Sequence, residues 1–469
     1  MNNSKLIKNF FYQASYQVLL IILPIVSIPI VSRALGPSGL GTYNYISSIV
    51  NYFVLVAGLG IANYGVREIS LAKKNITSLS EKFWEIQLFN MLFSSVVLFF
   101  YILFSTFMGN KILFLVQSMT VLASILDISW FFQGIEDFKR VTVVNALIKL
   151  LTFILIIVVM IFSPSLFWYT FIQSMSILLS ALIFWFFLRK KIILISISLK
   201  KIFGHFKPAM NFFILKIAAT LFINFNKTIL GVYSTMSAVG IFSNSLTLVT
   251  MVGSIINTIN IVLLPKMSEL HGDNNDKEMI KVLEKSLHFQ LFLTIPICFG
   301  IIAITPKMIN WFFGIEFSSM IYLVPILAPI VIFQALHQGI ASQFLVPKYE
   351  MHSYNITMIL GTILNITLGV ILVPKFNQYG AGVSFLLGQV VLAVSRTYVL
   401  TKKTNFSFNT ISILKYLISS IIMFIVIYLL TFKMNPTIMT TTLQALIGIA
   451  IYFGLTTLLK ANPILNFIE

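Results

Sequence analysis

The chain has 469 residues, of which 58% are hydrophobic and 10% are charged, and its formal net charge is +18. Soluble domains contain roughly 45–50% apolar and about 25% charged residues, so this composition excludes an ordinary soluble protein. A basic excess can indicate nucleic-acid binding. Here the positions of the basic residues, given below, explain the excess without a nucleic-acid partner.

About fourteen apolar segments follow one another along the chain, each near the ~20 residues that a helix needs to cross a bilayer. Only helices and closed barrels span lipid, and these segments lack the alternation of barrel strands. The sequence therefore predicts an all-α integral membrane protein with about 14 transmembrane helices. The predicted segments are residues 9–32, 43–64, 83–107, 112–133, 142–162, 166–188, 208–230, 239–263, 287–305, 320–345, 355–374, 380–400, 412–431 and 438–459.

The lysines and arginines are distributed unevenly between the two sides of the predicted membrane. Sorting them by alternate loops places about 24 on the side shared by both termini, about 5 on the other side and about 3 within the segments. By the positive-inside rule both termini are cytoplasmic. The same basic loops would attract anionic membrane lipids.

Motifs for catalysis, cofactors or metals are missing from the sequence. Cys298 is the one cysteine and lies in an apolar segment, where a small apolar filler is expected rather than a metal ligand. The sequence contains no Gly-x-x-x-x-Gly-Lys motif for a nucleotide. We therefore expect no catalytic residue, no cofactor and no metal site.

Two stretches of the chain echo each other. Residues 34–36 lead to residues 41–44, and residues 229–231 lead to residues 240–243, each as an apolar segment, a glycine turn and a Gly-x-aromatic-polar motif. Six segments separate the copies, which predicts parallel repeats around a central cavity. The expected parts are an N-terminal six-helix lobe over 1–200, a C-terminal six-helix lobe over 201–403 and two additional transmembrane helices over 404–469.

Three basic residues within or at the ends of the segments are candidate substrate-binding residues: Arg33, Lys216 and Lys227. A charge near the centre of a membrane helix costs roughly 2.5–3.5 kcal/mol. Lys216 and Lys227 are eleven residues apart in the seventh segment, which brings them within about 20° of one helix face. Thr220 and Asn224 lie on or near the same face, and the repeat places Arg33 toward the same cavity. Alternatively, Arg33 and Lys227 extend to the outer interface and Lys216 pairs with an acid.

Asp127 in the fourth segment and Lys149 in the fifth lie at similar predicted depths. They are interpreted as a structural ion pair, or Asp127 as a proton-coupling or gating acid. His337, in the tenth segment, is expected to be an interior histidine with its hydrogen bonds satisfied. A cavity lined by lysine and arginine favours an anionic, phosphorylated substrate.

Several motifs in order resemble a Wzx-type polysaccharide flippase of the multidrug/oligosaccharidyl-lipid/polysaccharide exporter superfamily. In the first half they are SRALGP at 32–37, GTYN at 41–44, YGVREI at 64–69 and DISWFFQGIE at 127–136. In the second half they lie at residues 264–268, 313–317, 327–329, 343–347, 372–375 and 380–382. The resemblance covers most of the chain.

The resemblance implies a flippase that moves an undecaprenyl-diphosphate-linked oligosaccharide from the cytoplasmic to the outer leaflet of a bacterial cell membrane, by alternating access. It further implies a role in capsule, exopolysaccharide or O-antigen biosynthesis beside polysaccharide polymerase and assembly proteins. Arg33 and Lys227 match the family's headgroup contacts, whereas Lys216 is inferred from its position alone. Asn226 and Gln389 stand where relatives often carry an acid, which weakens cation coupling at those positions.

Three alternatives remain at this point. A lipid II flippase has the same architecture, and a drug/cation antiporter of the same superfamily usually has about twelve spans and an acidic cation site. A membrane polysaccharide polymerase or glycosyltransferase would handle a related substrate but usually needs a sizeable polar loop. The outer loops here are short, and neither a Gly-x-Ser-x-Gly elbow nor a loop with paired carboxylates is present.

Overall fold

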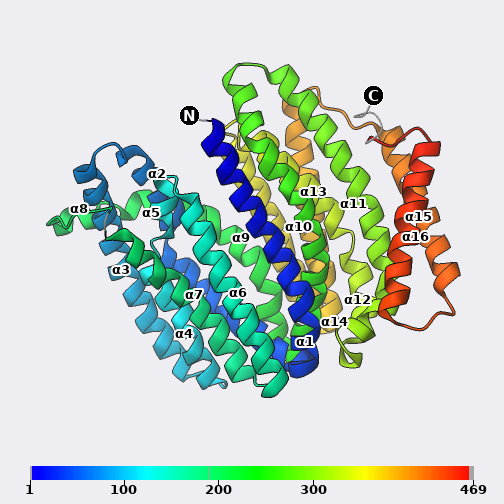
Figure 1. Ribbon diagram of the computed structural model, residues 1–469, viewed down its shortest axis with the longest axis horizontal. Coiled ribbons are helices and arrows are strands. Elements are labelled where there is room, and N and C mark those ends of the chain that lie inside the picture. Colours follow the sequence, from blue (N-terminus) through cyan, green and yellow to red (C-terminus); the bar gives the residue numbers. More distant parts are fainter. Residues whose placement is uncertain (1–2, 190, 464–469) are drawn as a thin grey trace. The chain divides into compact units, whose positions relative to one another are not determined.

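The computed structural model describes residues 3–189 and 191–463, and for residues 3–18, 21, 211, 214, 215 and 255 it describes the backbone alone. This part of the chain is helical and contains no β-strand (Figure 1). The helices are α1 Asn3–Gly58, α2 Ile61–Ala72, α3 Ile76–Thr106, α4 Lys111–Leu126, α5 Ser129–Gly134, α6 Phe138–Phe162, α7 Leu166–Leu188, α8 Leu199–Phe203, α9 Phe206–Tyr233, α10 Met236–Gly272, α11 Asp276–Phe312, η1 Ile315–Phe317, α12 Met320–Leu327, α13 Ile330–Ile340, η2 Ala341–Leu345, α14 Met351–Lys403, α15 Thr410–Thr431 and α16 Ile438–Leu458.

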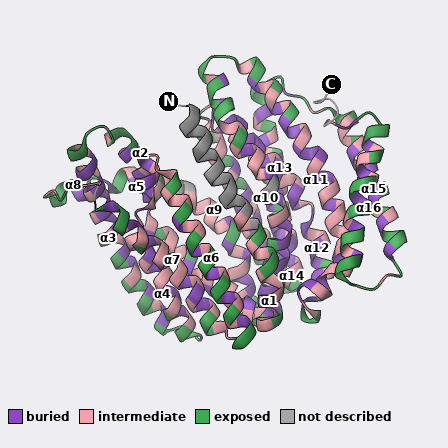
Figure 2. Cartoon of the chain, in the orientation of Figure 1, coloured by how far each residue is buried: buried purple, intermediate pink, exposed green. Residues whose placement is uncertain are grey.

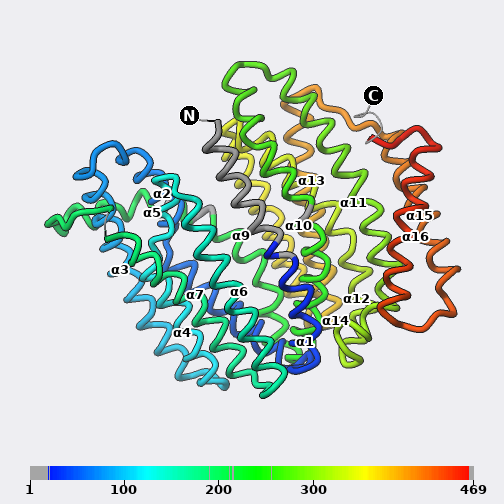
Figure 3. Tube along the Cα trace, viewed as in Figure 1, coloured from blue at the N-terminus to red at the C-terminus, as the bar shows by residue number. Residues whose placement is uncertain are grey.

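Eleven helices in the described part are long and apolar enough to cross a membrane. Two of them, which contain α1 and α14, each cover two of the segments expected from the sequence, and α9 is not counted among the eleven. Taking the halves of α1 and α14 separately and adding α9 gives the fourteen expected segments, whose order can be followed in Figure 3. The predicted all-α membrane fold is confirmed.

Two long helices continue where the sequence predicts a break between segments. Within α1 the non-helical residue is Gly36, with φ 65° and ψ 177°. Within α14 it is Asn377, with φ 48° and ψ −129°. Glycine and asparagine tolerate positive φ better than other residues, so each kink falls on a residue suited to it.

Several helices begin at a side-chain cap that the sequence provides. A capping side chain accepts a hydrogen bond from a backbone N–H that has no partner in the first turn. The capping residues of α3, α10, α11, α15 and α16 are Asn75, Thr235, Asn275, Asn409 and Thr437, respectively.

The chain divides into two compact units. Unit 1 consists of Met1–Leu35 and Thr42–Asn224, and unit 2 of Gly36–Gly41 and Phe225–Glu469. The lobes expected at 1–200 and 201–403, and the final part at 404–469, stay a prediction. Residues 464–469 of that final part lie outside the described residues.

In unit 1, α4 packs against α3 and α7, and α2 packs against α3 and α5. The contact of α2 with α5 joins two of the sequence motifs. A Cβ on Gly65 would lie 2.4 Å from the Trp130 ring, and a Cβ on Gly134 would lie 2.6 Å from Ile69. Both glycines therefore allow an approach that any larger residue would prevent.

In unit 2, α11 packs against α13 and α15, and α10 packs against α11, α13 and α14. The two glycines of the echoed motif meet here. A Cβ on Gly41 would lie 1.6 Å from the backbone oxygen of Met236, and a Cβ on Gly240 would lie 2.0 Å from that of Pro37. The repeat detected in the sequence thus brings its two copies together at glycine.

Large apolar side chains are exposed along the membrane-crossing helices rather than only at their ends (Figure 2). On α3 these include Leu92, Val96, Phe99, Phe100 and Leu103. A soluble protein would bury such a continuous apolar surface, whereas lipid tails solvate it. The exposed surface therefore fits a multi-pass membrane protein.

Candidate functional site

The polar face predicted on the seventh segment lines a cleft in unit 1. The cleft has a volume of about 370 Å³. Its polar lining consists of Lys216, Thr220 and Asn224 from α9 and Asn51 from α1. The remaining lining residues are Val54, Leu55, Gly58, Gly60, Ala219 and Ile223.

A chain of hydrogen bonds fixes one end of this cleft. The amide nitrogen of Asn51 donates to Asn224 Oδ1 at 3.3 Å. Asn224 Nδ2 in turn donates to the backbone oxygen of Thr220 at 3.0 Å. Asn224 is only 5% exposed, whereas Asn51 is exposed. The buried amide of Asn224 therefore holds the exposed amide of Asn51 in place.

Three groups in the cleft keep hydrogen-bonding capacity that no described residue uses: the Lys216 ammonium, the Thr220 hydroxyl and Asn51 Oδ1. Within the described residues, Lys216 also makes no ion pair within 4 Å. Polar groups inside a membrane protein are normally satisfied. Their free capacity makes this cleft the candidate binding site.

Asp127 lies at a break between two helices, not within one. Its backbone is extended after the end of α4, and its Oδ1 accepts a hydrogen bond from Ser129 N at 2.9 Å at the start of α5. Its charge interacts with that of Lys216. Asp127 is not among the described residues that line the cleft.

Lys149 is partly buried on α6. Among the described ion pairs within 4 Å, none joins it to Asp127. The electrostatic partner of Asp127 is Lys216. The expected roles, a structural ion pair of Asp127 with Lys149 or Asp127 as a proton-coupling or gating acid, stay predictions.

The other two candidate residues lie elsewhere in the chain. Arg33 is exposed on α1, three residues before the kink at Gly36, and belongs to unit 1. Lys227 is partly buried on α9 and belongs to unit 2. Neither is among the described residues that line the cleft. Lys216 is thus the one of the three that the described cleft contains.

Asn226, beside Lys227, takes part in a buried network in unit 2. Its amide nitrogen donates to Asn365 Oδ1 at 2.8 Å, and its Oδ1 accepts from the Ser384 hydroxyl at 3.1 Å. All three side chains are fully buried. The neutral side chains of Asn226, Asn365 and Ser384 thus bond to one another. The family resemblance implies that relatives often carry an acid at the position of Asn226.

A second buried network in unit 2 surrounds Arg396, which is 2% exposed. Its guanidinium donates to the backbone oxygen of His337 at 2.8 Å and to Thr357 Oγ1 at 3.3 Å, and lies 4.6 Å above the Tyr354 ring. His337 Nδ1 lies 3.1 Å from the guanidinium and its Nε2 lies 2.6 Å from Gln389 Oε1. Since Nδ1 must accept beside a cation, the imidazole proton is on Nε2 and donates to Gln389. His337 is satisfied, as the sequence predicts.

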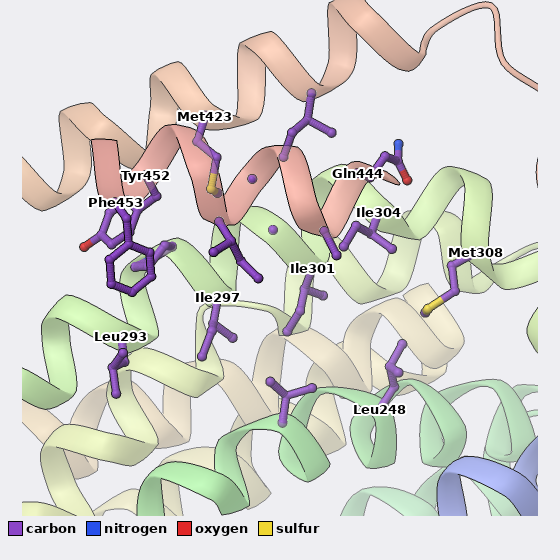
Figure 4. A pocket seen from close by; sticks show the side chains of 17 residues that line it. Leu248, Leu293, Ile297, Ile301, Ile304, Met308, Met423, Gln444, Tyr452 and Phe453 are labelled. Atoms are coloured by element: carbon purple, nitrogen blue, oxygen red, sulfur yellow. The ribbon is translucent and has the colours of Figure 1, made fainter. Parts of the chain in front are cut away.

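A second cleft, in unit 2, is almost purely apolar and has a volume of about 360 Å³. Figure 4 shows side chains of α10, α11, α15 and α16 converging on it, among them Leu248, Ile301, Met423 and Phe453. The hydroxyl of Tyr452, another lining residue, donates to the backbone oxygen of Phe292 at 2.7 Å. The Tyr452 hydroxyl is therefore used by the protein. Gln444 also lines the cleft: its Nε2 donates to Thr431 Oγ1 at 2.8 Å, and its Oε1 has no partner among the described residues. The rest of the lining is hydrocarbon.

A polar cluster at the start of α9 joins His205 to α2 and α3 within unit 1. His205 Nδ1 lies 2.6 Å from the Tyr64 hydroxyl, and Nε2 lies 3.1 Å from Glu85 Oε2. His205 precedes the membrane-crossing part of α9. Burial lowers the pKa of His205 below its ordinary value, and the hydrogen bond and charge of Glu85 oppose this shift only in part.

Metal-binding clusters of His, Cys, Asp and Glu are absent from the described part of the chain. Asn51, which lines the cleft from α1, is not evident as a site residue from the sequence. The available signal was a carboxamide within an otherwise apolar segment. Its partner Asn224 lies 173 residues further along the chain, so only the fold could bring the two together.

In the described part, apolar helices long enough to cross a membrane enclose polar groups, an arrangement typical of membrane transport proteins. The model of the polysaccharide biosynthesis protein family matches residues 6–271, and the model of the lipid II flippase MurJ matches residues 175–448. The chain therefore belongs to the polysaccharide biosynthesis protein family, within the flippase and exporter superfamily that its motifs predict.

A curated relative matches part of the chain. Over 152 residues the chain is 26% identical to the probable low-salt glycan biosynthesis flippase Agl15 of Haloferax volcanii. The match covers 30% of this chain and 32% of that protein, so it spans about a third of the relative's length.

Two solved structures share the fold. A lipid II flippase MurJ in an inward closed conformation has a TM-score of 0.73 at 17% identity, covering 97% of this chain and 98% of that one. An inward-facing multidrug resistance MATE family transporter has a TM-score of 0.64 at 13% identity, covering 84% and 99%. At these identities the likeness establishes the fold and nothing beyond it.

Proposed function

We propose that this protein is a flippase that moves an undecaprenyl-diphosphate-linked oligosaccharide from the cytoplasmic to the outer leaflet of a bacterial cell membrane. The observation that carries the proposal is the ammonium of Lys216, which lines a polar cleft in unit 1 without a hydrogen-bond partner among the described residues. A desolvated cation is costly unless a ligand neutralises it. A phosphate of the headgroup supplies the matching charge.

The charge of the substrate also gives a driving force. Moving an anion outward across an inside-negative membrane releases about 2.3 kcal/mol per charge for each 100 mV. The neutral network around Asn226 and the Gln389 partner of His337 offer no carboxylate for a coupling cation. Transport driven by the membrane potential is therefore favoured over coupling at these positions.

The apolar cleft in unit 2 suits the other part of such a substrate. Its lining is mostly hydrocarbon from four helices, the hydroxyl of Tyr452 is bonded to the backbone, and the amide nitrogen of Gln444 is bonded to Thr431. A polyprenyl segment is a methyl-branched hydrocarbon chain without polar atoms, for which burial of apolar surface is the dominant attraction. We assign this cleft to a segment of the lipid anchor, with the rest of the anchor in the bilayer.

Arg33 and Lys227 are proposed as further headgroup contacts, which the family resemblance supports, and Asp127 as the acid that tunes Lys216. The basic loops support cytoplasmic termini, of which residues 1–2 and 464–469 lie outside the described part. The proposed role in capsule, exopolysaccharide or O-antigen biosynthesis places polysaccharide polymerase and assembly proteins downstream.

A lipid II flippase is the second candidate, because residues 175–448 match the MurJ model. Lipid II is also a polyprenyl-diphosphate glycolipid, so the two candidates share the headgroup charge and differ in the sugar part.

The test is reconstitution of the purified chain in liposomes, with leaflet exchange followed for three labelled lipids. These are a polyprenyl-diphosphate oligosaccharide, lipid II and a polyprenyl alcohol without phosphate. We expect exchange of the first, accelerated by an electrical potential that is positive on the destination side. Faster exchange of lipid II would favour the second candidate, and equal exchange of the alcohol would overturn both.

A further inference from the structure

The unit 1 cleft has two kinds of polar group at its two ends, and only one of them is charged. The Lys216 ammonium is at one end, and Asn51, held by Asn224, is at the other. Eight residues of α9 separate Lys216 from Asn224, which corresponds to about 12 Å along the helix axis. The Thr220 side chain lies one turn from each, so polar groups recur along the whole cleft.

The orientation of the Asn51 amide follows from its partner. Asn224 Nδ2 is committed to the backbone oxygen of Thr220, so its Oδ1 is the atom that faces Asn51 and must receive an N–H. The amide nitrogen of Asn51 therefore donates its hydrogen bond to Asn224. Its Oδ1 has no partner among the described residues and is left as an acceptor at the cleft.

A phosphate alone does not explain this arrangement. A phosphate oxygen accepts hydrogen bonds, so it suits the Lys216 ammonium and the Thr220 hydroxyl but not the Asn51 carbonyl oxygen. An acceptor requires a donor on the ligand, and a sugar hydroxyl or the N–H of an acetamido group is such a donor. The distance along α9 is one that a phosphate together with one or two sugar rings can span.

We propose that the unit 1 cleft is a sugar-phosphate subsite, in which Lys216 binds the phosphate and Asn51 Oδ1 accepts a hydrogen bond from the sugar next to it. Thr220 binds between the two. Asn224 is a positioning residue, because it acts by aiming the Asn51 amide. This proposal deepens the proposed function, since it rests on a lipid-linked glycan substrate and assigns the residues that distinguish a glycosylated headgroup from a bare one.

The test compares two probes on the purified chain in nanodiscs: a short-chain polyprenyl diphosphate, and the same lipid carrying one N-acetylhexosamine. We expect the wild-type chain to bind the glycosylated probe several-fold more tightly, since one neutral hydrogen bond contributes about 0.5–1.5 kcal/mol. Asn51→Ala should abolish this preference and leave the affinity for the bare probe unchanged. Lys216→Met should weaken both probes equally, by roughly tenfold or more.

Asn224→Leu separates positioning from simple contact. It leaves Asn51 intact but removes the partner that aims it, so it should lower the preference for the glycosylated probe as Asn51→Ala does. Because Asn51 is exposed, its alanine variant tests the proposal even if Asn224→Leu does not fold. Asn110→Ala and Lys111→Gln, at exposed positions of α4, are matched controls and should leave both affinities unchanged.

Equal binding of the two probes by the wild-type chain would overturn the sugar subsite. So would an Asn51→Ala variant that weakens both probes alike. In either case the flippase proposal would stand, provided that Lys216→Met still weakens binding and leaflet exchange in liposomes persists. Loss of exchange for every polyprenyl-diphosphate lipid would instead overturn the flippase proposal itself.

Discussion

The clefts of the two units differ in what they leave unsatisfied. The unit 1 cleft presents an ammonium, a hydroxyl and a carboxamide oxygen that no described residue uses. The unit 2 cleft is of nearly the same volume and carries no charge, and apart from Tyr452 and one amide, that of Gln444, its lining is hydrocarbon. Unit 2 does contain polar groups, in the networks of Asn226 and Arg396, but there they bond to one another.

Polarity inside a membrane helix is therefore not by itself a sign of a binding site. A buried amide whose donors and acceptors are all matched stabilises the fold. An amide or ammonium at a cleft whose donors or acceptors are not all used by the protein is available to a ligand. Lys216 and Asn226 lie ten residues apart on α9. Lys216 keeps unused hydrogen-bonding capacity at a cleft, whereas the Asn226 side chain is bonded within the protein.

The largest effect is expected for Lys216→Met, which nearly preserves the length of the side chain and removes its charge. We expect leaflet exchange of a polyprenyl-diphosphate glycolipid to fall by roughly tenfold to a hundredfold, because a charge-assisted hydrogen bond contributes about 1.5–3 kcal/mol. The melting temperature in detergent should change little, because the desolvation cost of the ammonium is removed together with its attraction to Asp127. An unchanged exchange rate would show that the polar cleft has no role in transport.

In the network of Asn226 in unit 2, we expect a substitution to lower stability and to leave leaflet exchange unchanged. Asn365→Leu removes the acceptor of the Asn226 amide and should lower the free energy of unfolding by about 1–2 kcal/mol. Chemical denaturation in detergent measures this, with the exposed Asn435→Ala as control. Exchange per folded molecule should stay at the wild-type level. A loss of exchange without a loss of stability would place this network among the substrate contacts.

The apolar cleft can be filled at a glycine. A Cβ on Gly300 would meet no heavy atom within 4 Å, so Gly300→Leu should fill the cleft without straining the backbone. We expect exchange of a long-chain substrate to fall about three- to fivefold, while a short-chain analogue is affected less, because less hydrocarbon can be buried. Gly454→Leu is the matched control, since that glycine is exposed, equally open and outside the cleft lining.

The smallest expected effect concerns His205 in unit 1, which lies outside the membrane-crossing helices. Both of its ring nitrogens have a hydrogen-bond partner within the protein. Its pKa is lowered in the folded chain, so the unfolded chain binds the proton more readily. The contribution of His205 to the free energy of unfolding should therefore be complete above a pH of about 6.5 and be lost as the pH falls below it. Denaturation at pH 7.5 and 5.5 should show less pH dependence in His205→Gln, and an equal dependence in both would contradict the assignment.

Much of the fold could be predicted from the sequence because lipid imposes a simple rule on length and composition. The fourteen segments, the helical seventh segment that carries Lys216 and Lys227, and the satisfied state of His337 follow from residue type alone. The position of Asp127 could not be predicted in this way. The sequence places it inside a helix, whereas it lies in the break between α4 and α5, where its Oδ1 accepts a hydrogen bond from Ser129 N. The signal was local, since an Asp side chain commonly accepts from the backbone N–H two residues further on and so favours a turn.

The site was less predictable, because it depends on pairs that are far apart in the chain. Lys216, Thr220 and Asn224 share a helix face by periodicity, and they do line one cleft. Asn51 joins them from another helix, and the sequence contains nothing that pairs it with Asn224. The same holds for Asn226 and Asn365, which are 139 residues apart. Periodicity finds the face of one helix, and only tertiary structure decides what stands opposite.

The contact of Gly41 with Met236 and of Gly240 with Pro37 limits how this protein can be altered. The atoms that a new methyl group would strike belong to the main chain, which cannot rotate aside as a side chain does. Libraries that randomise these two positions should thus return the parental amino acid almost every time, whereas Gly300, with open space before it, should accept many alternatives. Mutational tolerance across the fold would then trace where peptide backbones touch.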